Sequence, residues 1–364
     1  MLFDPRPKER RGDLFDREKE IEKLKKSISN QPMTLLLGIR RIGKTSVLKV
    51  ALNELGAPYL YLDLRSLEDY SRASLYRLLS EAISGILPKW KRLREFLKNV
   101  RGVSIYGFRV EFDWRERSLT LSEILGSLNR FAGETEKGFL VVAFDEAQIF
   151  RNFSGGKGRI DFGRILAYAY DNLPNLRLVL TGSEAGLLFD ALRLEDPSSP
   201  LYGRYINIIR LERFDREKSI VFLRKGFEEL KMDVNEDMLH EICKRVDGIV
   251  GWLTYFGCSV YESKKVEREV LDEVTERALR LVGDELEKVF GKSRYYRLVL
   301  KAVSIGMDSW AGIKRAVEAW LGKPLHNAQI SRIIGNLIDL GLLEKTGDRY
   351  LIPDPLVSEY CRRL

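Results

Sequence analysis

Short apolar segments alternate with stretches of helical periodicity over the first 211 residues of the chain. The apolar segments, which predict buried strands, are residues 33–38, 58–64, 139–148, 176–184 and 206–211. The stretches with helical spacing are residues 14–28, 46–56, 71–100, 121–133 and 160–172. Strands that are apolar on both faces and separated by helices predict a parallel sheet covered by helices on each side.

Three local signals add detail to this order. Asp16 stands where an N-cap of the first helix is expected. Residues 103–114 alternate around Gly107, which predicts an antiparallel hairpin inserted into the α/β order. Residues 153–158, FSGGKG, predict a flexible loop.

The strand signal stops at about residue 212, and the rest of the chain is mainly helical. Residues 215–285 predict a group of helices, and the residues after them predict three helices followed by two short strands. That last order is typical of a winged helix. We therefore expect an α/β core at 1–211, a helical domain at 212–285 and a winged helix at 286–364.

Composition narrows the class of protein. The chain has 364 residues, 45% hydrophobic and 31% charged, with no apolar run long enough to span a membrane. Its first residues lack the apolar stretch of a secretory signal, and its three cysteines argue against a disulfide framework. With two histidines, a structural zinc site is not expected. These features predict a cytoplasmic protein with no membrane partner.

A phosphate-binding motif lies between the first apolar strand and the next helix. It comprises Gly38, Ile39, Arg40, Arg41, Ile42, Gly43, Lys44 and Thr45 and matches the P-loop pattern in full. Glycines let the backbone N–H groups turn toward phosphates, and the helix start adds its positive dipole end. Lys44 is expected to reach the β- and γ-phosphates, and the Thr45 hydroxyl to ligate magnesium. The alternative is a glycine-rich turn with an exposed lysine.

An acidic pair ends the strand at 139–148. Asp145 is expected to hold magnesium together with Thr45, because ligands of open α/β sheets bind at the carboxyl ends of the strands. Glu146 is expected to polarise the attacking water as the catalytic base. A helix-capping role for the pair is the alternative.

Three further residues are candidates for the same site. Thr181 and Ser183 end the next strand, where they are expected to contact the γ-phosphate or the attacking water, unless they serve only as turn residues. Arg204 precedes the last strand and is a candidate arginine finger or an ordinary surface arginine. A finger acting in trans requires an oligomer and one in cis allows a monomer, so the oligomeric state stays open.

Taken together, these motifs resemble the archaeal ATPase family, a branch of the STAND division of AAA+ proteins. The segments that carry the resemblance are LFDRE at 14–18, GIRRIGKTS at 38–46, AFDEAQ at 143–148, TGSE at 181–184, SPLYGR at 199–204 and GIVGWL at 248–253. The resemblance implies ATP or ADP with Mg²⁺ as ligands, a helical lid and a winged helix. It extends the phosphate-binding set to Ser46.

The resemblance also implies residues on the base side of the nucleotide. Phe15, Asp16 and Arg17 correspond to a segment that packs at the adenine in similar proteins. The family pattern GxPxxL has a proline where this chain has Val250, so the lid is expected to contact the nucleotide differently.

The C-terminal segment is compatible with two kinds of partner. The helix expected within 326–345 offers His326, Asn327, Gln329, Ser331, Arg332 and Asn336 as exposed residues. Residues 291–364 contain 12 Lys and Arg against 7 Asp and Glu, and the whole chain has a net charge of +8. This excess favours contact with DNA phosphates, but winged helices also bind proteins.

Three functions follow from these features. The first is an ATPase that acts as a nucleotide-driven conformational switch. The second is a DNA-binding AAA+ ATPase in the manner of origin-recognition initiators, which a salt-dependent affinity for duplex DNA would distinguish. The third is a nucleotide-dependent protein-interaction module with little turnover.

Overall fold

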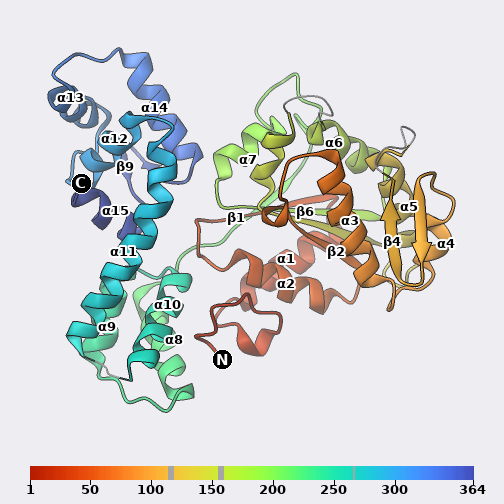
Figure 1. Ribbon diagram of the computed structural model, residues 1–364, viewed down its shortest axis with the longest axis horizontal. Helices are drawn as coiled ribbons and strands as arrows, with labels where there is room; N and C mark the ends of the chain where they lie inside the picture. Colours follow the sequence, from red (N-terminus) through yellow and green to blue (C-terminus); the bar gives the residue numbers. More distant parts are fainter. Residues whose placement is uncertain (114–118, 155–159, 265–266) are drawn as a thin grey trace.

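A five-stranded parallel sheet forms the centre of the N-terminal body. The structure is a computed structural model that describes residues 1–113, 119–154, 160–264 and 267–364 (Figure 1). The strands are β1 (Met33–Leu37), β2 (Tyr59–Asp63), β5 (Leu140–Asp145), β6 (Leu176–Gly182) and β7 (Asn207–Arg210), in the order β2-β5-β6-β1-β7. The predicted parallel sheet is confirmed.

Helices cover both faces of this sheet, as continuous burial of its central strands requires. Every residue of β1 and β5 is buried. Leu36 faces α1 (Glu18–Asn30) and α2 (Lys44–Leu55), whereas Leu35 and Leu37 face the opposite cluster. That second cluster is built by α3 (Arg72–Ile86), α5 (Leu121–Gly133) and α6 (Phe162–Asn172).

The inserted hairpin is also confirmed. β3 (Val103–Tyr106) and β4 (Arg109–Phe112) pair antiparallel, and the buried Phe112 ring lies edge-on to Tyr76 of α3. Residues 114 and 155–158, which belong to the expected hairpin and loop, lie outside the described residues.

Residues from 216 onward form a second, helical body beside the core. Its first helices are α8 (Arg216–Glu229), α9 (Glu236–Val246), α10 (Val250–Ser263) and α11 (Arg268–Phe290). They continue into α12 (Arg294–Ser304), α13 (Trp310–Leu321), α14 (Asn327–Asp339), the antiparallel pair β8 (Glu344–Thr346) and β9 (Arg349–Leu351), and α15 (Pro355–Arg362). One hydrophobic cluster joins all of these helices. No helix among the described residues has the length and apolarity needed to cross a membrane.

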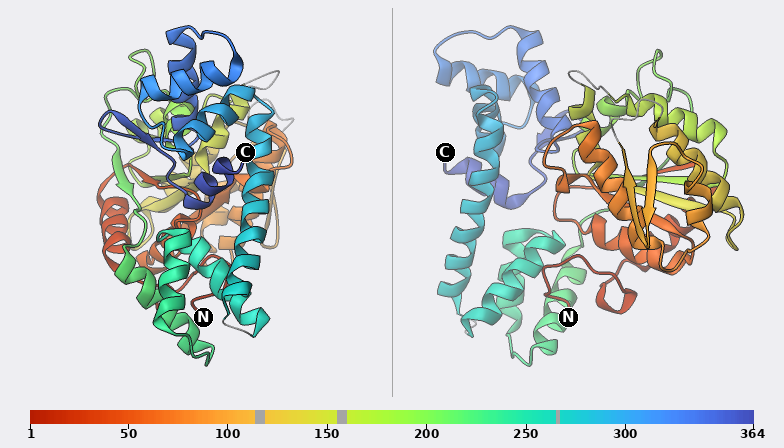
Figure 2. Two further views of the ribbon diagram at one scale, coloured as in Figure 1. Left: turned by 90° about the vertical axis from the view of Figure 1, so that its left-hand side faces the viewer. Right: turned by 45° about the vertical axis from the view of Figure 1, so that its right-hand side comes forward.

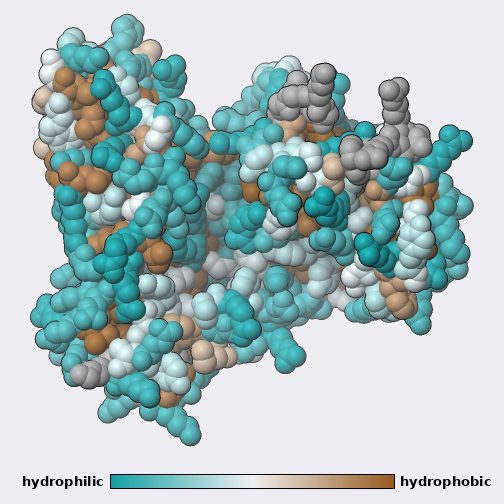
Figure 3. Space-filling model, in the orientation of Figure 1, coloured by the Kyte–Doolittle hydropathy of each residue, from teal (hydrophilic) through white to brown (hydrophobic). Residues whose placement is uncertain are grey.

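The two bodies stand side by side with a hollow between them. Figure 2 shows the helical body as a column along the core, and Figure 3 shows the surface hollowed between the two. At one end α14 packs against α7 (Ala185–Leu192), and at the other the N-terminal residues reach α8 and α10.

Several expected boundaries differ from the structure. α1 begins at Glu18 with Arg17 as its N-cap residue, so the N-cap prediction for Asp16 was wrong. Asp16 has a left-handed backbone, φ 46°, and pairs with Lys218 at 2.8 Å. α11 passes unbroken through the boundary expected at 285/286. Phe3 packs with the helical body rather than with the core.

Short elements complete the core. They are η1 (Arg11–Asp13), η2 (Leu64–Ser66), α4 (Leu93–Leu97) and η3 (Ala147–Ser154). The expected helix at 71–100 is divided because Pro88 follows the end of α3 at Ile86.

Candidate functional site

The P-loop joins β1 to α2, and its backbone suits an anion. α2 begins at Lys44, directly after Gly43, whose φ of 94° lies in the left-handed region that glycine tolerates. The first N–H groups of α2 therefore point toward the loop, where a phosphate would accept from them.

Lys44 is held inside the loop. Its ammonium donates to the carbonyls of Gly38 and Ile39, each at 2.9 Å, and the residue is 5% exposed. Burial lowers the pKa of Lys44 to about 8, although the nearby carboxylates of Glu146 and Asp145 oppose this. A phosphate in the loop would offer this buried cation a better partner than two carbonyls.

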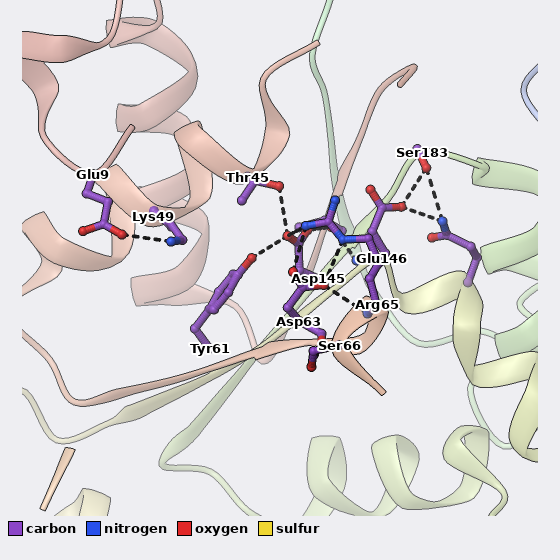
Figure 4. Close-up of polar contacts among 12 residues, drawn as sticks. Glu9, Thr45, Lys49, Tyr61, Asp63, Arg65, Ser66, Asp145, Glu146 and Ser183 are labelled. Carbon is purple, nitrogen blue, oxygen red and sulfur yellow. Dashed lines mark hydrogen bonds and ion pairs between the residues drawn. The ribbon is translucent and has the colours of Figure 1, made fainter. Parts of the chain in front are cut away.

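The two predicted magnesium ligands meet at the end of β5. Asp145 is fully buried, and its Oδ2 accepts from the Thr45 hydroxyl at 2.9 Å (Figure 4). The same oxygen accepts from the Tyr61 hydroxyl of β2 at 2.6 Å, and Arg65 lies 3.7 Å away. The Thr181 hydroxyl donates to Oδ1.

Glu146 is fixed by a second set of hydrogen bonds. Its backbone is left-handed, φ 57°, and its N–H donates to Thr181 Oγ1 at 3.0 Å. Its Oε2 accepts from the Ser183 hydroxyl at 2.7 Å and from the Gln148 side-chain amide at 2.6 Å (Figure 4). Burial alone would raise the pKa of Glu146, but Lys44 and these two hydrogen bonds outweigh it and the pKa is lowered. The carboxylate is therefore charged and oriented.

The prediction found only part of this set. Thr181 and Ser183 lie in the site, but in this structure their hydroxyls hold the two acidic residues. Tyr61, Arg65 and Gln148 were missed. The sequence signal for Gln148 was its position in the motif DEAQ, two residues after Glu146.

Arg204 is not part of the site within one chain. Its guanidinium forms two hydrogen bonds with Asp171 at the end of α6, at 3.0 and 2.5 Å, and lies near the Tyr170 ring. It lines neither cavity that contains Glu146. The structure therefore gives no support to a finger role in cis.

The two arginines of the P-loop turn toward other elements rather than inward. Arg40 pairs with Glu184 and lies 3.6 Å from Glu285 of α11. Arg41 pairs with Glu285, and its guanidinium lies over the Trp252 ring of α10, 4.2 Å from the centroid.

A cavity of about 670 Å³ extends from the P-loop between the core and the helical body. Phe15 and Arg17, two of the three residues predicted for the base side, line this cavity, whereas Asp16 lines a different one. Arg17 is 4% exposed, and its guanidinium lies 4.5 Å from the centroid of the Phe214 ring. Burial lowers the pKa of Arg17, although Glu20 opposes this.

The lid segment touches the P-loop directly. Val250, which stands at the family's proline position, is the first residue of α10 and lies over Gly43. The next N–H, that of Gly251, donates to the Arg41 carbonyl at 2.8 Å. Ser46 also lines the cavity, and its hydroxyl accepts from the Lys8 backbone N–H at 3.0 Å.

Comparison with known proteins gives consistent results. A family model described as an ATPase domain predominantly from Archaea matches residues 14–256. The Walker-type ATPase PABY2304 of Pyrococcus abyssi aligns over 100% of both chains with 37% identity and a TM-score of 0.86. The ORC2 protein of Aeropyrum pernix, in ADPNP–ADP complexes, aligns over 100% of this chain and 96% of its own, with 13% identity and a TM-score of 0.63. The second match shows the fold alone. No curated protein matches the sequence.

Proposed function

Because the chain belongs to the family of ATPase domains found predominantly in Archaea, it is an ATPase, and we propose that it acts as a magnesium-dependent, ATP-driven conformational switch. In this proposal ATP or ADP binds in the cavity between the core and the helical body, with its phosphates in the P-loop. Phe15 and Arg17 then lie beside the base.

The acidic end of β5 fits a magnesium ion. Thr45 and Asp145 provide a hydroxyl and a carboxylate in direct contact, and hard oxygen ligands of this kind suit the ion. A magnesium ion held there would supply charge neutralisation for the β- and γ-phosphates. Lys44 exchanges its two loop carbonyls for phosphate oxygens.

Glu146 is the proposed base for the attacking water. Since Ser183 and Gln148 both bond to Oε2, Oε1 is the oxygen that the described residues leave to accept a proton from water. The hydrogen bonds fix the carboxylate before the reaction, so little reorganisation is needed when charge develops.

A series of direct contacts from the P-loop to the C-terminal segment supports the switch proposal. Arg41 of the P-loop accepts a hydrogen bond from Gly251 and lies over Trp252. Trp252 Nε1 in turn donates at 2.8 Å to Asp354, which caps α15. A change in the P-loop on binding or losing the γ-phosphate thus reaches the C-terminal segment through packed groups with direct contacts.

Two substitutions test the ATPase site. We expect Lys44→Ala to abolish tight nucleotide binding and Glu146→Gln to keep binding while stopping turnover. Nucleotide affinity and phosphate release are measured on the same preparations. Normal turnover by Glu146→Gln would show that another group acts as the base.

The second candidate function is binding of duplex DNA through the C-terminal segment, which we propose has a winged-helix form. His326, Asn327, Ser331, Arg332 and Asn336 are exposed on or beside α14, and Gln329 is half-buried. DNA that stimulates turnover, with an effect that fades at higher salt, would favour this function. Turnover that DNA does not change would favour a switch that responds to a protein effector. Negligible turnover would favour the nucleotide-dependent protein-interaction module.

A further inference from the structure

The first residues of the chain cross from the helical body to the P-loop helix. Figures 1 and 2 show this segment between α8 and α10 on one side and α1 and α2 on the other. It is anchored at both ends, and residues 4–8 between the anchors line the nucleotide cavity.

Phe3 is the anchor in the helical body. Its ring is fully buried, with centroids 5.7 Å from Phe222 and 5.0 Å from Phe227. Gly226 of α8 and Gly257 of α10 make room for it, because a Cβ on either would lie 2.3 or 2.5 Å from the ring. Two hydrogen bonds secure the backbone around it, from Cys258 Sγ to the Phe3 carbonyl and from the Leu2 N–H to Glu229, both at 2.7 Å.

The second anchor is on α2, the helix that begins in the P-loop. The Lys8 backbone N–H donates to Ser46 Oγ at 3.0 Å. Glu9 pairs with Lys49 at 2.9 Å, and Arg11 pairs with Glu54. The first of these contacts, at Ser46, lies two residues after Lys44.

We infer that residues 2–8 are part of the nucleotide site: they form a wall of the cavity and retain the bound purine nucleotide. This inference rests on the proposed function. Tyr255 and Ser259 of α10 line the same cavity. Because the segment is fixed to both bodies, a nucleotide can leave past it only if one anchor is released or the two bodies separate. The segment therefore slows dissociation.

Phe3→Ala tests the inference without altering a residue that lines the cavity. We expect a ribose-labelled fluorescent ADP, chased by unlabelled ADP, to dissociate roughly tenfold faster, the change that 1.4 kcal/mol of lost retention gives. Phe290→Ala is the matched control. Phe290 is buried in the same hydrophobic cluster but does not line the cavity. It should lower the melting temperature without accelerating dissociation. Equal dissociation rates in the two variants would overturn the inference.

A second substitution tests the other anchor. Lys8→Pro removes the backbone N–H that donates to Ser46 and leaves the serine in place. We expect faster dissociation here too. The double variant should release nucleotide no faster than the faster single variant, because either change frees the same segment. Additive effects would overturn the inference, because they would show that the two anchors do not act through one segment.

The same assay separates the inference from the proposed function. If the wild-type chain does not bind the labelled ADP, the proposed function fails and the inference fails with it. If the wild type binds, Lys44→Ala does not and Phe3→Ala releases ADP at the wild-type rate, only the inference is overturned.

Discussion

At the residue scale, the site is a small hydrogen-bond network in which each acidic side chain has its own set of partners. Asp145 is held by Thr45, Tyr61 and Thr181, and Glu146 by Ser183 and Gln148. Such contacts bring together β2, β5, β6 and α2. A left-handed backbone at Glu146 costs free energy that these hydrogen bonds offset.

Gln148→Leu tests whether this support matters for catalysis. We expect kcat to fall by roughly tenfold to a hundredfold with little change in KM, a part of the 10²–10⁴ that a general base contributes. Gln148 Oε1 has no hydrogen-bond partner within the described part of the chain, so leucine removes a buried acceptor that is already unpaired. Steady-state ATP turnover measures both constants.

Asn152→Leu serves as the control for that change. Asn152 is an exposed amide on the same short helix η3. It should leave kcat near the wild-type value. If Gln148→Leu also turns over normally, the amide does not position Glu146.

Individual side chains of the site were predicted less completely from the sequence than the secondary structure was. Motif spacing located Lys44, Thr45, Asp145 and Glu146, because the P-loop and the strand end carry local signals. Tyr61 gave no such signal: its strand reads as apolar, and only the pairing of β2 with β5 brings its hydroxyl to Asp145. Phe3 likewise gave no signal, because it lies in a mainly charged segment. Only the folded helical body shows that it is buried.

At the scale of elements, the strands and long helices could be predicted because burial repeats along them. Continuous apolar runs identified the strands of the sheet, and Gly56 marked the end of α2. α7 was not anticipated, since AGLLFDAL extends the apolar composition of β6 without a clear change of period. α11 crosses the expected boundary because its buried positions, among them Val282 and Leu286, continue on either side of it.

The contact between α7 and α14 leads to a prediction about the charge of Asp339. Gly186 allows it, because a Cβ there would lie 2.2 Å from the Asp339 carboxylate. Partial burial, with Asp190 and Glu195 nearby, raises the pKa of Asp339. Asp339→Asn removes the charge and keeps the shape. We expect it to stabilise the fold at neutral pH by at most about 1 kcal/mol, because solvent screens a half-buried carboxyl.

The sign of the pH dependence checks the cause. A carboxyl with a raised folded pKa binds its proton more readily when folded, so its unfavourable effect is present at neutral pH and disappears as the pH falls through that pKa. The difference in unfolding free energy between Asp339→Asn and wild type, from urea titrations, should therefore shrink on acidification. A difference that stays constant with pH would assign the effect to something other than this charge.

At the scale of the whole molecule, the switch depends on three of the sets of contacts that join the two bodies around the cavity. They are the N-terminal segment, the P-loop contacts with Glu285 and Trp252, and the packing of α14 on α7. Gly341 brings the turn after α14 against the Ser183 carbonyl, where a Cβ would lie 3.0 Å away. The C-terminal segment thus touches the residue that holds Glu146, and the phosphate site and this segment are expected to move together.

In the proposed switch, the nucleotide state sets the position of the C-terminal segment relative to the core. The most direct test is a distance distribution between labels at the exposed Glu136 and Lys345, recorded in Glu146→Gln with no nucleotide, with ATP and with ADP. We predict that the ATP and ADP distributions differ, and that Lys44→Ala abolishes the difference. Superimposable distributions in all three states, in a chain whose wild type hydrolyses ATP, would contradict the switch.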